Sequence, residues 1–73
     1  MKLTIKNKNY TKGEIIKILR EWTELTQKEL AKQINKSEIS IQKYEADEIN
    51  YNIETLLNIC KKNNITITFE KEK

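Results

Sequence analysis

The chain of 73 residues has no histidine, no proline, one cysteine and one glycine. A single cysteine cannot form an internal disulfide, and without histidine the usual Cys/His zinc site is excluded. No uninterrupted apolar run exceeds two residues, so neither a membrane-spanning helix nor a signal-peptide core is predicted. These absences indicate a soluble protein of a reducing cytoplasm that uses no cofactor.

The length predicts one small domain, residues 1–73, with 37% hydrophobic side chains. A domain of this size buries only about 60% of the surface that its unfolded chain exposes, so a deep catalytic cleft is not expected. Gly13 is the only glycine, which excludes a glycine-rich phosphate loop, and Cys60 has no histidine to activate it. The sequence therefore argues against an enzyme.

The formal net charge is +3, and 13 of the 14 basic residues are lysine. Residues 1–24 hold six bases and three acids, whereas residues 25–47 and residues 48–73 are each balanced at four and four. This surplus permits nucleic acid or an anionic surface as a partner but is weak evidence alone. Lys, Asn and Ile make up 33 of the 73 residues, and their AT-rich codons favour a bacterial or phage source.

Hydrophobic spacing predicts a mainly α fold with four helices and a short β-strand near each end. The strands are expected at about residues 2–6 and 65–70, and the helices at about 12–23, 27–34, 38–46 and from 53 to Asn63-Asn64. Thr11 and Thr26, each followed three residues later by a glutamate, predict capping boxes. Ser37 and Asn52 predict the N-caps of the last two helices.

The predicted core is made by one apolar face from each helix. The candidates are Ile15, Ile16, Ile18, Leu19, Trp22, Leu30, Ala31, Ile34, Ile41, Tyr44, Ile53, Leu56, Leu57, Ile59 and Cys60. Trp22 is expected in the core rather than as a stacking platform, and Cys60 as a buried, inert thiol.

Residues 26–45 predict two short capped helices joined by a tight turn, which is the helix-turn-helix arrangement. A small Ala31 lets the two helices approach, while Ile34 and Ile41 fill the corner between them. The outer side of the second helix then carries Glu38, Ile39, Gln42 and Lys43, where base edges would be met. Without further support, an ordinary helical corner in a small bundle explains this pattern equally well.

The sequence resembles the xenobiotic-response-element family, which includes the lambdoid phage Cro and repressor proteins. The matching stretches are Leu19-Arg20-Glu21, Leu25 to Ala31 (LTQKELA), Ser37, Ile41, Tyr44-Glu45 and Ile53 to Cys60 (IETLLNIC). The resemblance covers roughly residues 14–66. It implies a lambda-repressor-like helix-turn-helix domain that binds double-stranded DNA.

The resemblance also implies roles for individual residues. Gln27 would meet a phosphate and brace the second helix of the motif, and Arg20 and Glu45 would form a partly buried structural salt bridge. The implied DNA-binding set is Gln27, Lys28, Lys36, Ser37, Glu38, Ile39, Ser40, Gln42 and Lys43. No metal-binding and no catalytic residue is implied.

The chain departs from the family where glycine is usual, near Glu24, Asn35 and Asp47, and where proline is usual, near Tyr51. Asn35 and Asp47 tolerate left-handed backbone, whereas Glu24 in that conformation costs about 1 kcal/mol. The base-reading face also lacks arginine, so the base preference follows only in outline.

Two interpretations of function remain open from the sequence. The first is a dimeric, sequence-specific repressor of phage, plasmid or antitoxin type, bound to a palindromic operator and, in the antitoxin form, to a toxin. Its second copy would pair along the open edge of the terminal strands. The alternative is a protein-interaction module that keeps the fold without binding DNA. Lys2, Lys6, Lys8 and Lys12 either only aid solubility or contact phosphate as a basic arm.

Overall fold

The computed structural model describes residues 2–6 and 10–70, with side chains over residues 10–68. The elements in chain order are β1 (Lys2–Lys6), α1 (Lys12–Trp22), α2 (Gln27–Gln33), α3 (Glu38–Glu45), α4 (Ile53–Lys62) and β2 (Thr66–Glu70). The predicted mainly helical fold is confirmed. Each predicted helix and strand boundary lies within one residue of the observed one.

The helix starts follow the capping pattern of the sequence. Thr11 and Thr26 each form a complete capping box with the glutamate three residues on. The Ser37 side chain accepts a hydrogen bond from the Ser40 backbone at 3.1 Å, and the Asn52 side chain accepts one from the Thr55 backbone at 2.9 Å. Local sequence therefore sets where every helix begins.

The turns are made by non-glycine residues in left-handed backbone. The φ angles of Glu24, Asn35 and Asp47 are 59°, 58° and 59°, and that of Asn64 after α4 is 53°. Asparagine and aspartate adopt this region with little strain, whereas Glu24 has a side chain that disfavours it. The turns expected at these three sites are thus present without glycine.

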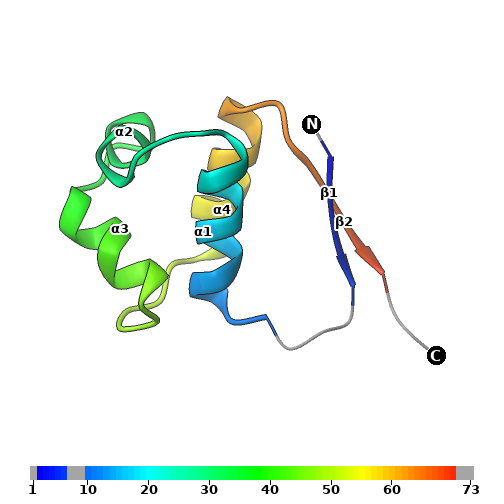
Figure 1. Ribbon diagram of the computed structural model, residues 1–73, viewed down its shortest axis with the longest axis horizontal. Coiled ribbons are helices and arrows are strands. Elements are labelled where there is room, and N and C mark those ends of the chain that lie inside the picture. The colour runs from blue at the N-terminus through cyan, green and yellow to red at the C-terminus, as the bar shows by residue number, and fades with distance from the viewer. Residues whose placement is uncertain (1, 7–9, 71–73) are drawn as a thin grey trace.

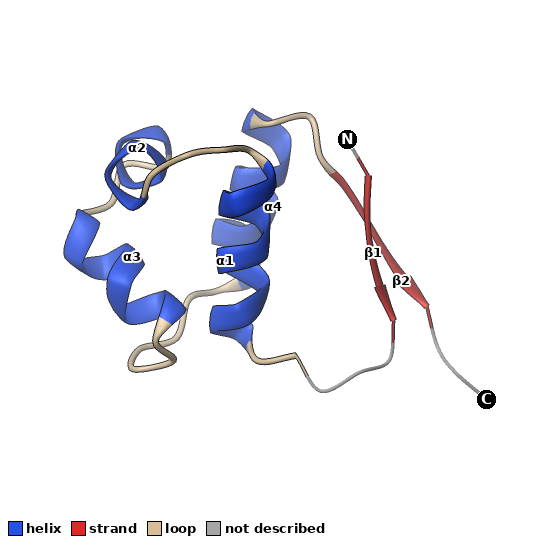
Figure 2. Cartoon of the chain, in the orientation of Figure 1, coloured by secondary structure: helices blue, strands red, loops and turns tan. Residues whose placement is uncertain are grey.

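The two strands pair with each other in parallel, with Lys2 opposite Thr66 and Lys6 opposite Glu70. Parallel strands need a long crossover, and here residues 7–65, including all four helices, provide it. The sheet lies on one side of α1 and α4, while α2 and α3 lie on the other (Figures 1 and 2). The motif is therefore at the end of the molecule away from the sheet.

The core lies between the four helices. Its buried apolar side chains are Ile16, Leu19, Leu30, Ala31, Ile34, Ile41, Tyr44, Tyr51, Leu56, Ile59, Cys60 and Ile65, and Ile67 of β2 packs partly against them. Burial raises the pKa of Cys60, which keeps it as a neutral thiol. Among the described residues, no helix is long and apolar enough to span a membrane.

Three residues predicted for the core are exposed instead. Trp22 is 45% exposed because the stripe that it shares with Ile15 and Ile18 runs along the edge of the buried face of α1. Ile53 and Leu57 of α4 are also exposed, since the apolar arc of that helix is wider than the surface that covers it. The prediction that these three side chains are buried was wrong.

The N-terminus of α1 packs tightly against the end of α3. Gly13 donates its backbone N–H to the Asp47 carboxylate at 2.8 Å, and a Cβ at Gly13 would lie 2.5 Å from the carbonyl oxygen of Tyr44. The Tyr51 hydroxyl donates to the Lys12 carbonyl at 2.6 Å, and burial raises the pKa of Tyr51 to about 12. These contacts fix the C-terminal end of α3 relative to α1.

Candidate nucleic-acid interface

Helix α3 has one buried and one exposed side. Ile41 and Tyr44 point into the core, and the Tyr44 ring meets the Tyr51 ring edge-on at a centroid distance of 5.4 Å. The opposite side is exposed and carries Glu38, Ile39, Gln42 and Lys43, with Ile39 61% exposed. The side chains expected on the outer side of this helix are therefore open to solvent within the described part of the chain.

The start of α3 presents two hydroxyl groups. Ser37 caps the helix, and its Oγ lies 2.9 Å from the Oγ of Ser40. Ser37 is exposed and Ser40 is half-buried. Hydroxyl groups at a helix N-terminus, where backbone N–H groups point outward, suit contact with phosphate or base edges.

Glu45 ties α3 to the two preceding helices. Arg20 of α1 donates to it through Nε at 2.6 Å and through Nη2 at 3.1 Å, and Gln27 of α2 donates through Nε2 at 3.2 Å. The Arg20 and Glu45 side chains are only 16% and 6% exposed. Arg20 also donates to the carbonyl of Leu25 at 3.0 Å, which holds the turn before α2.

This network fixes the angle at which α3 is presented. The hydrogen bond to Glu45 raises the pKa of Arg20, so the guanidinium stays charged and the ion pair persists. Gln27 braces Glu45 from the first turn of α2, in the manner that the family resemblance implies. The ion pair implied for Arg20 and Glu45 is present.

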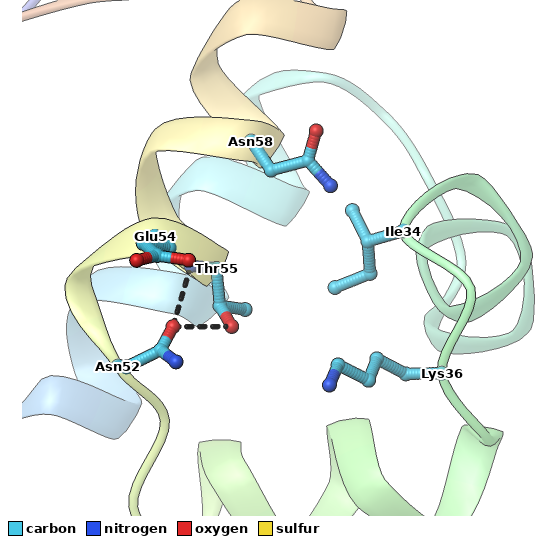
Figure 3. Close-up of a pocket in the computed structure, with 6 residues that line it drawn as sticks. All are labelled: Ile34, Lys36, Asn52, Glu54, Thr55 and Asn58. Atoms are coloured by element: carbon cyan, nitrogen blue, oxygen red, sulfur yellow. Dashed lines mark hydrogen bonds between the residues drawn. The ribbon is translucent and has the colours of Figure 1, made fainter.

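The remaining predicted contact residues are cations on exposed surface. Lys28 lies in the first turn of α2 and Lys36 in the turn before α3, and both are exposed. Lys36 also borders a polar groove of about 340 Å³ beside the start of α4. In Figure 3 its side chain extends across this groove toward Asn52.

The proposed basic arm is only partly described. Lys8 lies outside the described residues, and Lys2 and Lys6 are described by their backbone alone. Lys12 is engaged with Tyr51: its Nζ donates to the Tyr51 carbonyl and lies 4.7 Å from the centre of the Tyr51 ring. Its ammonium is thus used inside the fold, an interaction between distant residues that sequence spacing does not signal.

The residues from 10 to 70 contain no group of three or more Cys, His, Asp or Glu that could hold a metal ion. A helix-turn-helix family model matches residues 16–69, which include all four residues of the Arg20, Leu25, Gln27 and Glu45 network. Searches of curated proteins and of solved structures returned no match.

Proposed function

This chain belongs to the Cro/C1-type helix-turn-helix family of DNA-binding regulatory domains, and from that premise we propose that it binds a specific DNA sequence through the exposed side of α3. The observation that carries the proposal is the contrast between the two sides of this helix. Ile41 and Tyr44 anchor one side in the core, while Ile39 and Lys43 face solvent on the other. A rigid helix with a free polar side is what major-groove recognition requires.

The residues of that side offer several kinds of base contact. Lys43 can donate to the O6 and N7 of guanine, Gln42 can bond adenine, and Ile39 can pack against a thymine methyl group. Glu38 can accept a hydrogen bond from the amino group of cytosine, which offsets its repulsion from nearby phosphates. Ser37 and Ser40 contact the backbone or a base beside them.

The phosphate backbone is met by groups around the motif. Lys28 in the first turn of α2 and Lys36 in the turn before α3 lie on exposed surface, and the first turn of α2 also presents Gln27. Each phosphate neutralised by a lysine releases bound counterions, so the affinity falls as salt is added, with a log–log slope of about −0.9 per phosphate.

The regulator acts as a dimeric repressor of phage, plasmid or antitoxin type, in the cytoplasm, by occluding a promoter. A two-fold dimer matches a palindromic operator with half-sites about one helical turn apart. The two-stranded sheet of the described residues has an unpaired edge on each strand, which is one surface for a second copy. If the regulator is an antitoxin, it also binds a toxin partner.

One observation favours a second candidate, a protein-interaction module without DNA binding. Residues 25–47, which contain the whole motif, hold four bases and four acids, and exposed Glu38 stands in the first turn of α3. A motif without net charge that exposes an acidic residue also suits a basic protein partner.

Selection of bound sequences from random duplex DNA tests the two candidates. We expect one enriched, two-fold symmetric sequence, bound with an affinity that falls steeply between 50 and 200 mM salt, as is typical of several phosphate contacts. No enriched sequence, or binding that is independent of salt, contradicts the proposal and favours the interaction module.

A further inference from the structure

Helix α4 carries an aliphatic stripe that nothing within residues 10–68 covers. Ile53 and Leu57 are 59% and 54% exposed, and as residues i and i+4 they lie one above the other on the helix surface. Lys61 continues the same line one turn later, and Glu54 lies beside it, both exposed. This α4 stripe, residues 53, 54, 57 and 61, is separate from the exposed side of α3.

An apolar groove extends the α4 stripe toward α1. Its volume is about 300 Å³, and its lining is Lys12, Ile15, Tyr51, Ile53 and Leu56. Ile53 therefore belongs both to the stripe and to the rim of the groove. When a partner covers large aliphatic side chains beside an apolar groove, the removal of their surface from water stabilises the complex.

The charges of α4 indicate which partner fits. Glu54 stands in its first turn, and Lys61 and Lys62 stand in its last turn. When two copies of this helix lie antiparallel about Leu57, Glu54 of each meets Lys61 of the other, and their dipoles oppose. A two-fold interface must be self-complementary in this way.

We propose that a second copy of this chain docks on the α4 stripe, with the two α4 helices antiparallel. Leu57 packs against its counterpart at the two-fold axis. Ile53 packs against the aliphatic stem of Lys61 from the partner, whose ammonium pairs with Glu54. The inference rests on the dimer in the proposed function and replaces the sheet edge as its main contact.

The interface is small, since α4 has 10 residues and spans about 15 Å. A contact of this size falls at the low end of specific interfaces and gives a weak dimer in solution. Simultaneous occupation of two half-sites on DNA then supplies the missing affinity, because the second copy binds as part of a linked pair.

Sedimentation equilibrium of the full chain without DNA tests the proposal. Leu57→Glu is expected to weaken self-association at least tenfold while leaving the helical circular dichroism and the melting temperature of the dilute protein unchanged. Ile49→Glu is the matched control: it puts the same charge on an exposed isoleucine outside the stripe and is expected to leave the dimerisation constant unchanged.

Charge-reversal variants test the antiparallel arrangement more specifically. Glu54→Lys is expected to weaken the dimer, and Glu54→Lys combined with Lys61→Glu is expected to restore it, because the antiparallel pair is rebuilt with opposite signs. Three outcomes would overturn the inference. The wild-type chain could stay monomeric, or the double variant could fail to recover the dimer. The dimer could also be lost through Thr68→Pro in β2 but not through Leu57→Glu. DNA binding is measured in a separate experiment. The self-association data therefore test the α4 interface even if the chain does not bind DNA.

Discussion

Glu45 joins three helices through hydrogen bonds. It lies on α3, accepts two hydrogen bonds from Arg20 of α1 and accepts one from Gln27 of α2. Both charges are largely removed from water. The net stabilisation from the pair is therefore smaller than the cost of leaving one of the two charges unpaired. The orientation of α3 thus depends on contacts with both preceding helices.

Replacing Glu45 by alanine is expected to lower the free energy of unfolding by about 3 kcal/mol, since it strands the Arg20 charge in a nearly buried position. Urea denaturation measures the change. The double variant Arg20→Met with Glu45→Met is expected to recover most of the loss, because no unpaired charge remains. Glu48→Ala, which removes an exposed carboxylate, serves as the control and is expected to change stability by less than about 0.5 kcal/mol. A loss for Glu45→Ala no larger than that of the control contradicts this account.

Individual residues divide into those that sequence patterns predict and those that they do not. The caps at Thr11, Thr26, Ser37 and Asn52 follow from local spacing and are all present. Trp22 was assigned to the core because helical periodicity gives the direction of a side chain but not the extent of the surface that covers it. For Lys12 the sequence leaves solubility and a basic arm open, and it gives no sign of the contact with Tyr51 because that residue lies 39 positions away.

Among the elements, α1 and α3 approach each other closely at a glycine. Gly13 has the carbonyl oxygens of Tyr44 and Glu45 and a carboxylate oxygen of Asp47 where a Cβ would stand, at 2.5, 2.7 and 2.8 Å. Two of these three atoms are backbone, which gives way only if the helix moves. The glycine therefore sets the distance at which α1 supports the end of α3.

The substitution Gly13→Ala separates helix propensity from packing. Propensity alone predicts a gain of up to about 1 kcal/mol, because alanine is the better helix former. The close approach predicts a net loss of about 2 kcal/mol, as overpacking usually costs. Thermal unfolding distinguishes the two, with Lys17→Ala on the exposed side of α1 as the control. A higher melting temperature for Gly13→Ala would show that the junction is loose.

The helices could be predicted within one residue because their caps, apolar spacing and turns are local signals. The close contact at Gly13 could not, because the sequence gives Gly13 only as part of a capping box. The strands were predicted, but the direction of their pairing was not. Their parallel pairing across 64 positions of sequence, from Leu3 to Ile67 for example, is set by how the four helices fold between them.

In the whole molecule, α1 and α4 lie between the helix-turn-helix motif and the terminal sheet (Figure 1). The exposed side of α3 is covered neither by the described part of the sheet nor by any other element within residues 10–68. The α4 stripe lies outside the motif, so a second copy docked there leaves the reading helix free. One small core thus supports two separate exposed surfaces, the one proposed for DNA and the one proposed for a partner copy.

The most direct test of the account is the affinity of Ser40→Ala and Lys43→Ala variants for the DNA selected by the wild-type chain. Lys43 is exposed and the half-buried Ser40 hydroxyl shares a hydrogen bond with the Ser37 hydroxyl, so both variants are expected to keep a melting temperature close to that of the wild type. If α3 reads bases, each variant binds the selected DNA about 5- to 100-fold more weakly, as loss of a base contact implies. The matched control Lys32→Ala, on the exposed surface of α2, is expected to bind as the wild type does. Wild-type affinity in both α3 variants, or equal losses in all three, would contradict the claim that this helix recognises DNA.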